Sequence, residues 1–384
     1  MEFIKYNLLE NPFRVGPEVD PSKLIWVGRN DLKQKIKQRI NYGIKTSPSR
    51  LVLNWGSYGS GKTHAANFFT RTDFIKNNFE GKTKNLKINL PRSSKNAVQA
   101  FLRALLGQLN FDNIIKDFAE LEGKFPDNIE QIIESSTQDS IIAEFLKLFV
   151  KKGHYFENNK EVFEKQIPYN SLKDVLYGNK IDKATQNQLQ VTIGLDDDEQ
   201  IVNLLSGIFN CITYDKNLYK AVFLWIDEFE DINTLPKSTQ DRFTTFLRQL
   251  FDKTPNNLNI FINFTLKTFA EIEDLSYQLG EALANRTNVY IEFDLLSIED
   301  AKDYLLELLN HEKFRPQNGD KTFAPFTSSA VTDVLEKIGK FSIRKINETF
   351  SLLIELALIE ENPPDEIDLN FVHKVKSELI HYKG

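Results

Sequence analysis

Eight consecutive residues have the types and spacing of a phosphate-binding loop. Residues 56–63 read Gly-Ser-Tyr-Gly-Ser-Gly-Lys-Thr and fit the pattern G-x-x-x-x-G-K-[S/T]. The apolar run 51–55 precedes the motif, and apolar residues at helical spacing follow it, so the local context is the strand, loop and helix that the motif requires. We therefore predict that the chain binds a nucleoside triphosphate.

Each part of this motif has a role in holding phosphate. Glycines let backbone N–H groups turn toward phosphate oxygens, and the following helix adds the positive end of its dipole. Lys62 is expected to reach the β- and γ-phosphates, and the Thr63 hydroxyl to ligate Mg²⁺. The nucleotide-binding residues predicted here are Gly56, Ser57, Tyr58, Gly59, Ser60, Gly61, Lys62, Thr63 and His64.

An acidic pair ends a second apolar run. Residues 221–226 are all apolar, which is typical of a strand buried on both faces of a parallel sheet. Asp227 and Glu228 follow at once and would lie at the carboxyl edge of that sheet, where α/β proteins bind ligands. Asp227 is suited to hold Mg²⁺, and Glu228 to act as the general base that polarises the attacking water. Together with the loop, the pair predicts hydrolysis as well as binding.

Guanine nucleotides are disfavoured. Residues 179–182 read Asn-Lys-Ile-Asp and match the guanine-recognition pattern N-K-x-D, but they precede the 221–226 strand, whereas in GTPases this pattern follows it. The residues after Asp227 also lack the D-x-x-G of a GTPase switch. We therefore interpret the match at 179–182 as chance in a chain rich in asparagine and lysine.

A third strand end offers polar side chains. Residues 258–265 read as another buried strand. Asn263 and Thr265 lie near its end, and either side chain is suited to contact the γ-phosphate or the attacking water. The sequence does not separate the two.

The segments that follow occur in an order found in one ATPase superfamily. A strand is predicted at 289–293 shortly after Arg286, and an amphipathic helix containing Arg344 begins near residue 342. With the two nucleotide motifs, this order resembles the AAA+ ATPases, in the branch of origin-recognition initiators, transposition ATPases and related bacterial ATPases. The resemblance runs from residue 27 to about residue 360. It implies an α/β P-loop core with a three-layer parallel sheet, followed by a C-terminal helical lid, and it implies ATP as the nucleotide with Mg²⁺ as its metal.

The resemblance also implies roles for arginines. Arg286 matches the arginine finger, which completes the ATP site of a neighbouring subunit, so a homo-oligomer with shared sites is expected. Arg344 matches the sensor 2 arginine, which links the lid to the γ-phosphate of its own subunit. The simpler alternatives are a surface pair of Arg286 with Glu281 and an exposed Arg344.

A short segment near the start of the chain matches the part that lines the adenine pocket in this branch. It consists of Val27, Gly28 and Arg29. A plain turn into a helix at 31–40 is the alternative.

Composition is that of a cytoplasmic protein. The 384-residue chain has one cysteine, Cys211, so it forms no intramolecular disulfide. Its N-terminus lacks a signal-peptide core, and no apolar run approaches the roughly 18 residues that a bilayer span needs, so no membrane contact is expected. The net charge of −6 gives no overall basic field, and any contact with DNA must use a local patch.

We divide the chain into an N-terminal segment at 1–25, a nucleotide-binding core at 26–296 and a helical lid at 297–384. The core has an anomaly, because its second strand, near 86–90, lies far from the third at 221–226. Polar residues without a persistent period fill 151–195. We read about 110–195 as an inserted, mainly helical element in which family-specific function resides. Helices are predicted at 97–109, 113–121, 129–133, 140–150 and 196–210.

The predicted lid begins with a capped helix. Ser297 and Asp300 have the spacing of a capping box in an acidic variant. Further helices are predicted at 328–339, 343–358 and 371–381. Origin-recognition initiators continue into a winged-helix domain, and the forty residues after Arg344 are too few for one, which argues against direct sequence-specific origin binding.

Basic residues around the second strand are one candidate for DNA contact, with an ordinary solvated face as the alternative. They are Lys82, Lys84, Lys87, Arg92, Lys95 and Arg103. A phenylalanine-rich stretch at 243–251 has helical spacing and is predicted to be core, not a base-stacking platform.

Two functions remain. The first is an oligomeric, DNA-associated ATPase that loads, remodels or licenses a partner on double-stranded DNA. The second is a regulatory switch of the kind found in bacterial phage-defence (antiviral) systems, which binds a protein partner through the inserted element without DNA. Salt-sensitive DNA affinity would favour the first, and partner-dependent assembly the second.

Overall fold

Five parallel strands form the centre of the molecule. The computed structural model describes residues 2–16, 18, 20–92, 96–158, 169–189, 195, 197–266, 279–315, 321–339 and 341–383. The strand order is β2-β3-β4-β1-β5, and every neighbouring pair is parallel. This confirms the predicted α/β P-loop fold. The strands are β1 (Arg50–Gly56), β2 (Lys84–Asn89), β3 (Val222–Asp227), β4 (Leu258–Thr265) and β5 (Thr287–Phe293).

The register brings the carboxyl ends of the strands together. Gly56 at the end of β1 pairs with Thr265 at the end of β4, and Asn89 at the end of β2 pairs with Asp227 at the end of β3. The phosphate-binding loop follows β1 directly, so the acidic strand end and the loop lie at one edge of the sheet. This is the edge where parallel sheets bind ligands.

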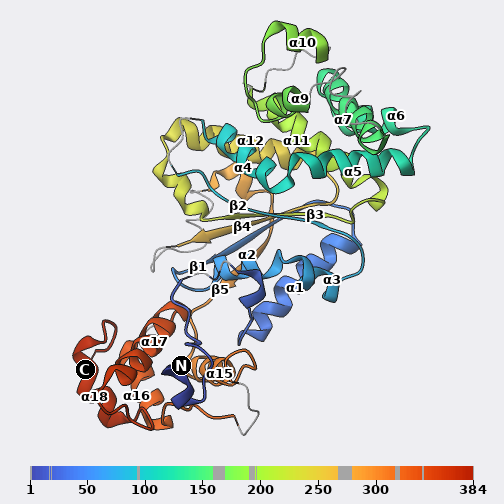
Figure 1. Cartoon of the computed structure of the whole chain (residues 1–384). Helices are drawn as coiled ribbons and strands as arrows, with labels where there is room; N and C mark the ends of the chain where they lie inside the picture. Colours follow the sequence, from blue (N-terminus) through green and yellow to red (C-terminus); the bar gives the residue numbers. More distant parts are fainter. Residues whose placement is uncertain are drawn as a thin grey trace.

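Helices cover both faces of the sheet, as Figure 1 shows. One face is covered by α1 (Asn30–Lys45), α2 (Lys62–Phe69) and α3 (Thr72–Asn78). Aliphatic side chains of α1 and aromatic side chains of α2 and α3 are buried there in one cluster with Trp225 and Phe261. The other face is covered by α4 (Ala97–Leu109), α11 (Asp198–Ile212) and α12 (Lys237–Lys253). The phenylalanine-rich stretch predicted as core lies in α12, where Phe243 and Phe246 are buried.

Further helices extend the second face. They bury a continuous apolar cluster with α4 and α11, and in Figure 1 they lie on the side of the sheet away from the C-terminal helices. The predicted helices are present. The stretch 151–195, whose sequence has no persistent period, also contains helix, because α7 continues to Asn158 and two short helices follow. They are α5 (Phe111–Lys124), α6 (Ile129–Ser136), α7 (Ser140–Asn158), α9 (Tyr169–Leu176) and α10 (Lys183–Leu189).

The C-terminal helices form a separate apolar cluster together with the N-terminal segment, in which Tyr6, Leu8 and Phe13 are buried. The capping box of Ser297 and Asp300 is present as predicted. The last predicted helix ends early, since α18 stops at residue 375 and a short 3-10 turn follows. The helices are α15 (Ile298–Leu309), α16 (Ser328–Ile338), α17 (Ile343–Ile359) and α18 (Leu369–Val375). The short helix α14 (Glu281–Ala284) precedes β5 and buries Leu283 in the apolar cluster of the core instead.

Within the described ranges, no helix combines the length and apolarity that crossing a bilayer requires.

Candidate functional site

The phosphate-binding loop has a backbone that glycine makes possible. Gly56, Gly59 and Gly61 have φ values of 154°, 76° and 96°, a region that L-residues with a side chain rarely adopt. A Cβ on Gly56 would lie 2.5 Å from the carbonyl oxygen of Phe293 on β5. With this conformation the loop lies directly against the neighbouring strand, and the loop ends at the N-terminus of α2.

Lys62 folds back over the loop. Its ammonium donates to the carbonyl oxygens of Gly56 at 3.0 Å and Ser57 at 2.9 Å, and to Oγ of Ser60 at 3.2 Å. The side chain is 6% exposed. Burial lowers the pKa of Lys62 to about 8, although nearby carboxylates oppose the shift. A buried cation with an acid-shifted pKa is one that an incoming anion stabilises.

Asp227 and Thr63 face each other across the carboxyl edge of the sheet. The Thr63 hydroxyl donates to Oδ1 of Asp227 at 3.3 Å, and the Asn263 amide donates to the same oxygen at 2.9 Å. Asp227 is 2% exposed, and its Oδ2 makes no hydrogen bond to the described residues, although the Lys87 ammonium lies 3.4 Å away in an ion pair. A buried carboxylate oxygen beside a hydroxyl is a donor set that fits Mg²⁺, which takes oxygen ligands from one or two side chains and from substrate phosphates.

Asn263 is a buried member of this group. Its amide also donates to the carbonyl oxygen of Lys62 at 3.0 Å, and its Oδ1 accepts from Asn54 at 2.9 Å. Thr265, the other residue that the sequence leaves open, has its backbone N–H bonded to Glu230 at 3.0 Å. Both residues line the same cavity, with the hydrogen-bonding capacity of Asn263 already used inside the protein.

Glu228 points toward the end of β2. Its backbone lies in the left-handed region, at φ 55°, so that Asp227 and Glu228 face different ways. Its Oε2 accepts from Arg92 at 2.7 Å and from Asn89 at 3.3 Å. Arg92 also pairs with Asp231 at 2.7 Å, and these carboxylates raise the pKa of the guanidinium. The sequence reading does not foresee these contacts.

The basic residues considered for DNA contact are therefore not a free patch. Lys87 forms an ion pair with Oδ2 of Asp227 at 3.4 Å. Lys84 pairs with Asp117 at 2.8 Å in a mostly buried position, and Lys82 pairs with Glu120 at 3.2 Å. Arg103 contacts the carbonyl of Tyr177, and Lys95 lies outside the described residues. The side chains that look basic along the sequence are largely neutralised in the fold.

The segment before α1 contacts both the phosphate-binding loop and the C-terminal helices. Gly28 and Arg29 both have left-handed backbones, at φ 63° and 50°. The Arg29 guanidinium donates to the carbonyl of Ser60 at 2.6 Å, and the Gly28 N–H donates to Glu307 on α15 at 2.8 Å. Burial lowers the pKa of Arg29. The segment thus joins the phosphate-binding loop to the lid, which is more than a plain turn does.

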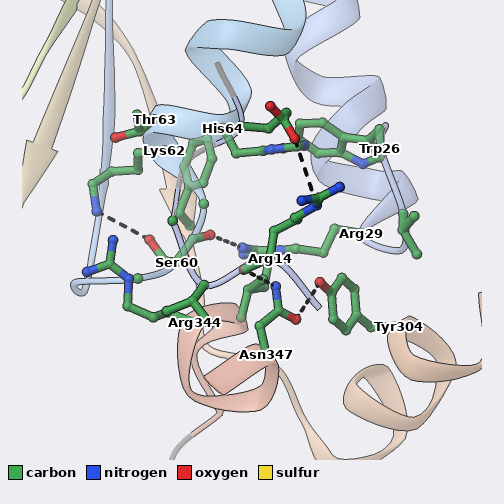
Figure 2. Close-up of a pocket in the computed structure, with 18 of the residues that line it drawn as sticks. Arg14, Trp26, Arg29, Ser60, Lys62, Thr63, His64, Tyr304, Arg344 and Asn347 are labelled. Atoms are coloured by element: carbon green, nitrogen blue, oxygen red, sulfur yellow. Dashed lines mark hydrogen bonds and ion pairs between the residues drawn. The ribbon is translucent and has the colours of Figure 1, made fainter. Parts of the chain in front are cut away.

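A cavity of about 240 Å³ lies between the loop, the N-terminal segment and the lid (Figure 2). His64 contacts the Ile25 carbonyl at its rim, and burial lowers the pKa of this histidine. Most of the predicted site residues line it: Val27, Arg29, Tyr58, Gly59, Ser60, Gly61, Lys62, Thr63, His64, Asp227, Glu228, Asn263, Thr265 and Arg344.

The sequence reading misses one end of this cavity. Lining residues there come from the N-terminal segment and the lid, and no local motif marks them: Arg14, Trp26, Tyr304, Leu308, Phe314 and Asn347. Tyr304 donates to Asn347 at 2.9 Å, and Asn347 donates to the carbonyl of Arg14 at 2.8 Å. An apolar and aromatic surface with a few fixed polar groups is what a nucleoside base requires.

Arg286 lies apart from this cavity. Its guanidinium makes two bonds to Asp252 at the end of α12, at 2.6 and 2.8 Å. The carboxylate raises the pKa of Arg286. Arg286 therefore pairs with Asp252, 34 residues earlier in the chain, whereas the simpler sequence interpretation named Glu281 as its partner. The pair stands at the amino end of β5, opposite the edge that holds the phosphate-binding loop.

Solved structures with a similar fold agree with the resemblance inferred from the motifs. A Drosophila ORC chain, in a structure bound to DNA, is 13% identical, with 99% of this chain and 66% of that chain covered and a TM-score of 0.51. The Aeropyrum pernix ORC2 protein, solved in ADPNP and ADP complexes, is 12% identical, with 94% and 72% covered and a TM-score of 0.50. No protein-family model matches the chain, and neither does any curated protein. At this identity the likeness shows the fold alone, which is the α/β fold of these two ORC chains.

Proposed function

We propose that this protein is a Mg²⁺-dependent ATP hydrolase of AAA+ type. The observation that carries the proposal is that Lys62, Thr63, Asp227 and Glu228 line one cavity. These are the residue types that a P-loop ATPase uses to bind phosphate, hold the metal and activate water. The cavity continues into an aromatic pocket of a kind that suits a base.

In this proposal the loop N–H groups and Lys62 bind the phosphates of ATP. Asp227 and Thr63 hold the metal, which when bound offsets negative charge on the phosphate oxygens. Asn263 fixes the carboxylate of Asp227, since both of its amide hydrogens are given to protein oxygens. Thr265 is then the better candidate for contact with the γ-phosphate or the attacking water.

Glu228 supplies the general base. Its carboxylate accepts a proton from the water that attacks the γ-phosphorus, the bond to the β,γ-bridging oxygen breaks, and the products are ADP and phosphate. For this step the carboxylate must be available to water, whereas here it accepts hydrogen bonds from Arg92 and Asn89. Both contacts are made by Oε2, so their release would free this oxygen for the attacking water.

The direct test is the rate of phosphate release with ATP and Mg²⁺, with and without a metal chelator. Lys62→Ala serves as the control that lacks the phosphate-binding cation. A wild-type protein that binds ATP tightly and never releases phosphate would contradict the hydrolase proposal.

We further propose a homo-oligomer that acts on double-stranded DNA, with Arg286 completing a neighbouring site. The likeness to an ORC chain in a structure bound to DNA supports this assignment. The rate per subunit should rise with protein concentration and with DNA, and the DNA effect should weaken with salt. A rate per subunit that changes neither with protein concentration nor with DNA would contradict the proposed DNA-associated oligomer.

A protein-binding switch is the second candidate function. The observation in its favour is the group of helices α5, α6, α7, α9 and α10, which lies away from the lid while the basic residues near β2 are neutralised. Under this alternative, a protein partner bound to these helices sets assembly, as in a phage-defence ATPase, and DNA has no effect on turnover.

The pKa of Lys62 predicts how ATP affinity depends on pH. In the protein without nucleotide, Lys62 has a pKa of about 8. Bound phosphates stabilise the charged form of Lys62, so above pH 8 the binding of ATP is accompanied by the uptake of a proton. We expect the Kd for ATP to rise about fivefold from pH 8 to pH 9. Lys62→Arg keeps its charge throughout this range and should remove the dependence. A wild-type Kd that stays constant to pH 9.5 would show that Lys62 is not the group involved.

The contact between Arg92 and Glu228 predicts a gain of activity. Arg92→Ala removes a charged hydrogen bond that occupies the general base, and because the pair is largely exposed, the effect should be modest. We expect turnover to rise about twofold to fivefold at unchanged ATP affinity. Arg103→Ala is the matched control, since Arg103 contacts a backbone carbonyl away from Glu228. Slower turnover in Arg92→Ala would instead mean that Arg92 assists catalysis.

A further inference from the structure

Tyr58 is an exposed aromatic side chain inside the phosphate-binding loop. It is 67% exposed, whereas Ser60 and Lys62 of the same loop are buried. The loop motif requires no particular residue at this position. The presence of a large, exposed aromatic ring beside the cavity is therefore not explained by phosphate binding alone.

The guanidinium of Arg344 stacks on the ring of Tyr58. The guanidinium carbon lies 4.3 Å from the ring centroid, well inside the distance at which an arginine is attracted to an aromatic face. Nη1 of Arg344 also donates to the phenol oxygen. The ring face and the hydroxyl thus hold the same side chain, which comes from the first turn of α17.

The backbone beside this stack is fixed as well. The N–H of Arg344 donates to the carbonyl of Gly59 at 3.3 Å. A Cβ on Gly59 would lie 2.8 Å from Cβ of Arg344, so the first turn of α17 rests directly on the loop. The lid therefore touches the loop through its backbone and, independently, through the stacked pair.

Arg344 is aimed at the phosphate side of the cavity. Figure 2 shows its side chain extending toward the side where Lys62 and Ser60 lie. An arginine loses much rotamer freedom when it is ordered, and a side chain that is already held loses less on binding. Stacking on Tyr58 thus lowers the entropy that Arg344 loses when it binds an anion.

We propose that Tyr58 is a positioning residue that holds the guanidinium of Arg344 against the phosphate-binding loop and so sets the preference of the site for nucleoside triphosphates over diphosphates. This inference rests on the proposed ATPase function. It assigns Tyr58 no contact with the reacting atoms, because its effect passes through Arg344.

The test compares the affinities for a non-hydrolysable ATP analogue and for ADP in wild type, Tyr58→Ala, Tyr58→Phe and Arg344→Ala. Tyr58→Ala should lower the preference for the triphosphate about threefold to tenfold, with ADP affinity unchanged. Tyr58→Phe keeps the ring and should retain most of the preference. In the Arg344→Ala background, Tyr58→Ala should have no further effect. With ATP, kcat should fall more than KM changes.

A matched control exists on α1. The Arg39 guanidinium lies 5.7 Å from the ring centroid of Tyr42, which is 45% exposed, and Tyr42→Ala should leave both affinities unchanged. An unchanged or increased triphosphate preference in Tyr58→Ala overturns the inference, and so does an effect that persists without Arg344. If the wild-type protein binds no nucleotide, both the proposed function and this inference fail. If the wild-type protein hydrolyses ATP and Tyr58→Ala leaves the preference for the triphosphate unchanged, only this inference fails.

Discussion

Glu228→Gln is expected to slow ATP hydrolysis about 10²-fold to 10⁴-fold while ATP binding stays intact, because glutamine accepts no proton from the attacking water. The amide is nearly isosteric, so the loss reports the chemistry and not the packing. The measurement is single-turnover phosphate release, with ATP affinity determined separately in the same variant.

The position of Glu228 makes this test informative. Its carboxylate bonds to Arg92 and Asn89, so a purely structural role would also be affected by the substitution. The matched control is Asp231→Asn, which removes the other carboxylate that Arg92 contacts and leaves the base in place. A stable ATP-bound state in Glu228→Gln, with near-normal turnover in Asp231→Asn, is the expected pair of results. Retained turnover in Glu228→Gln would exclude it as the base.

The centre of the site follows from the sequence because its parts are local. The loop at 56–63 and the pair Asp227-Glu228 are each contiguous, and each stands at the end of an apolar run that predicts a buried strand. Parallel strands must place such ends at one edge of the sheet. A correct strand prediction therefore already brings Thr63 close to Asp227.

The groups that surround this centre do not follow from the sequence. Lys87 and Arg92 look like part of a basic surface, yet they reach Asp227 and Glu228 because β2 pairs with β3 in a register that sets Asn89 beside Asp227. Register between strands more than a hundred residues apart leaves no local pattern. For the same reason, charge clusters on an edge strand are poor predictors of a nucleic-acid surface until their partners are known.

Helix content shows a related contrast. Long amphipathic helices such as 97–109 begin and end as predicted, because the apolar spacing and flanking residues agree. The short helices α9 and α10 are not predicted, since seven or eight residues give too few turns for a clear period. Their stability comes from packing, with Leu172 and Leu176 buried in the cluster shared with α4 and α11.

The bidentate pair of Arg286 with Asp252 bears directly on the proposed oligomer. Two charge-assisted bonds hold the guanidinium in a fixed orientation on the surface of the core. A finger that acts in a neighbouring subunit must leave this pair, or carry the carboxylate with it, in order to approach phosphate. The isolated subunit and the assembled one should therefore differ in the partner of Arg286.

Arg286→Ala is accordingly expected to bind ATP normally and to hydrolyse it about 10³-fold more slowly, because the charge that offsets the developing phosphate charge is lost. Asp252→Asn is the companion variant: it frees Arg286 from its carboxylate and should preserve turnover or raise it. Mixing Arg286→Ala with Lys62→Ala should restore part of the rate, since a Lys62→Ala subunit still supplies a finger to an intact site next to it. No recovery at any mixing ratio would contradict action in trans. An equal loss in Asp252→Asn would mean that the ion pair stabilises the core and that its arginine has no role in a neighbouring site.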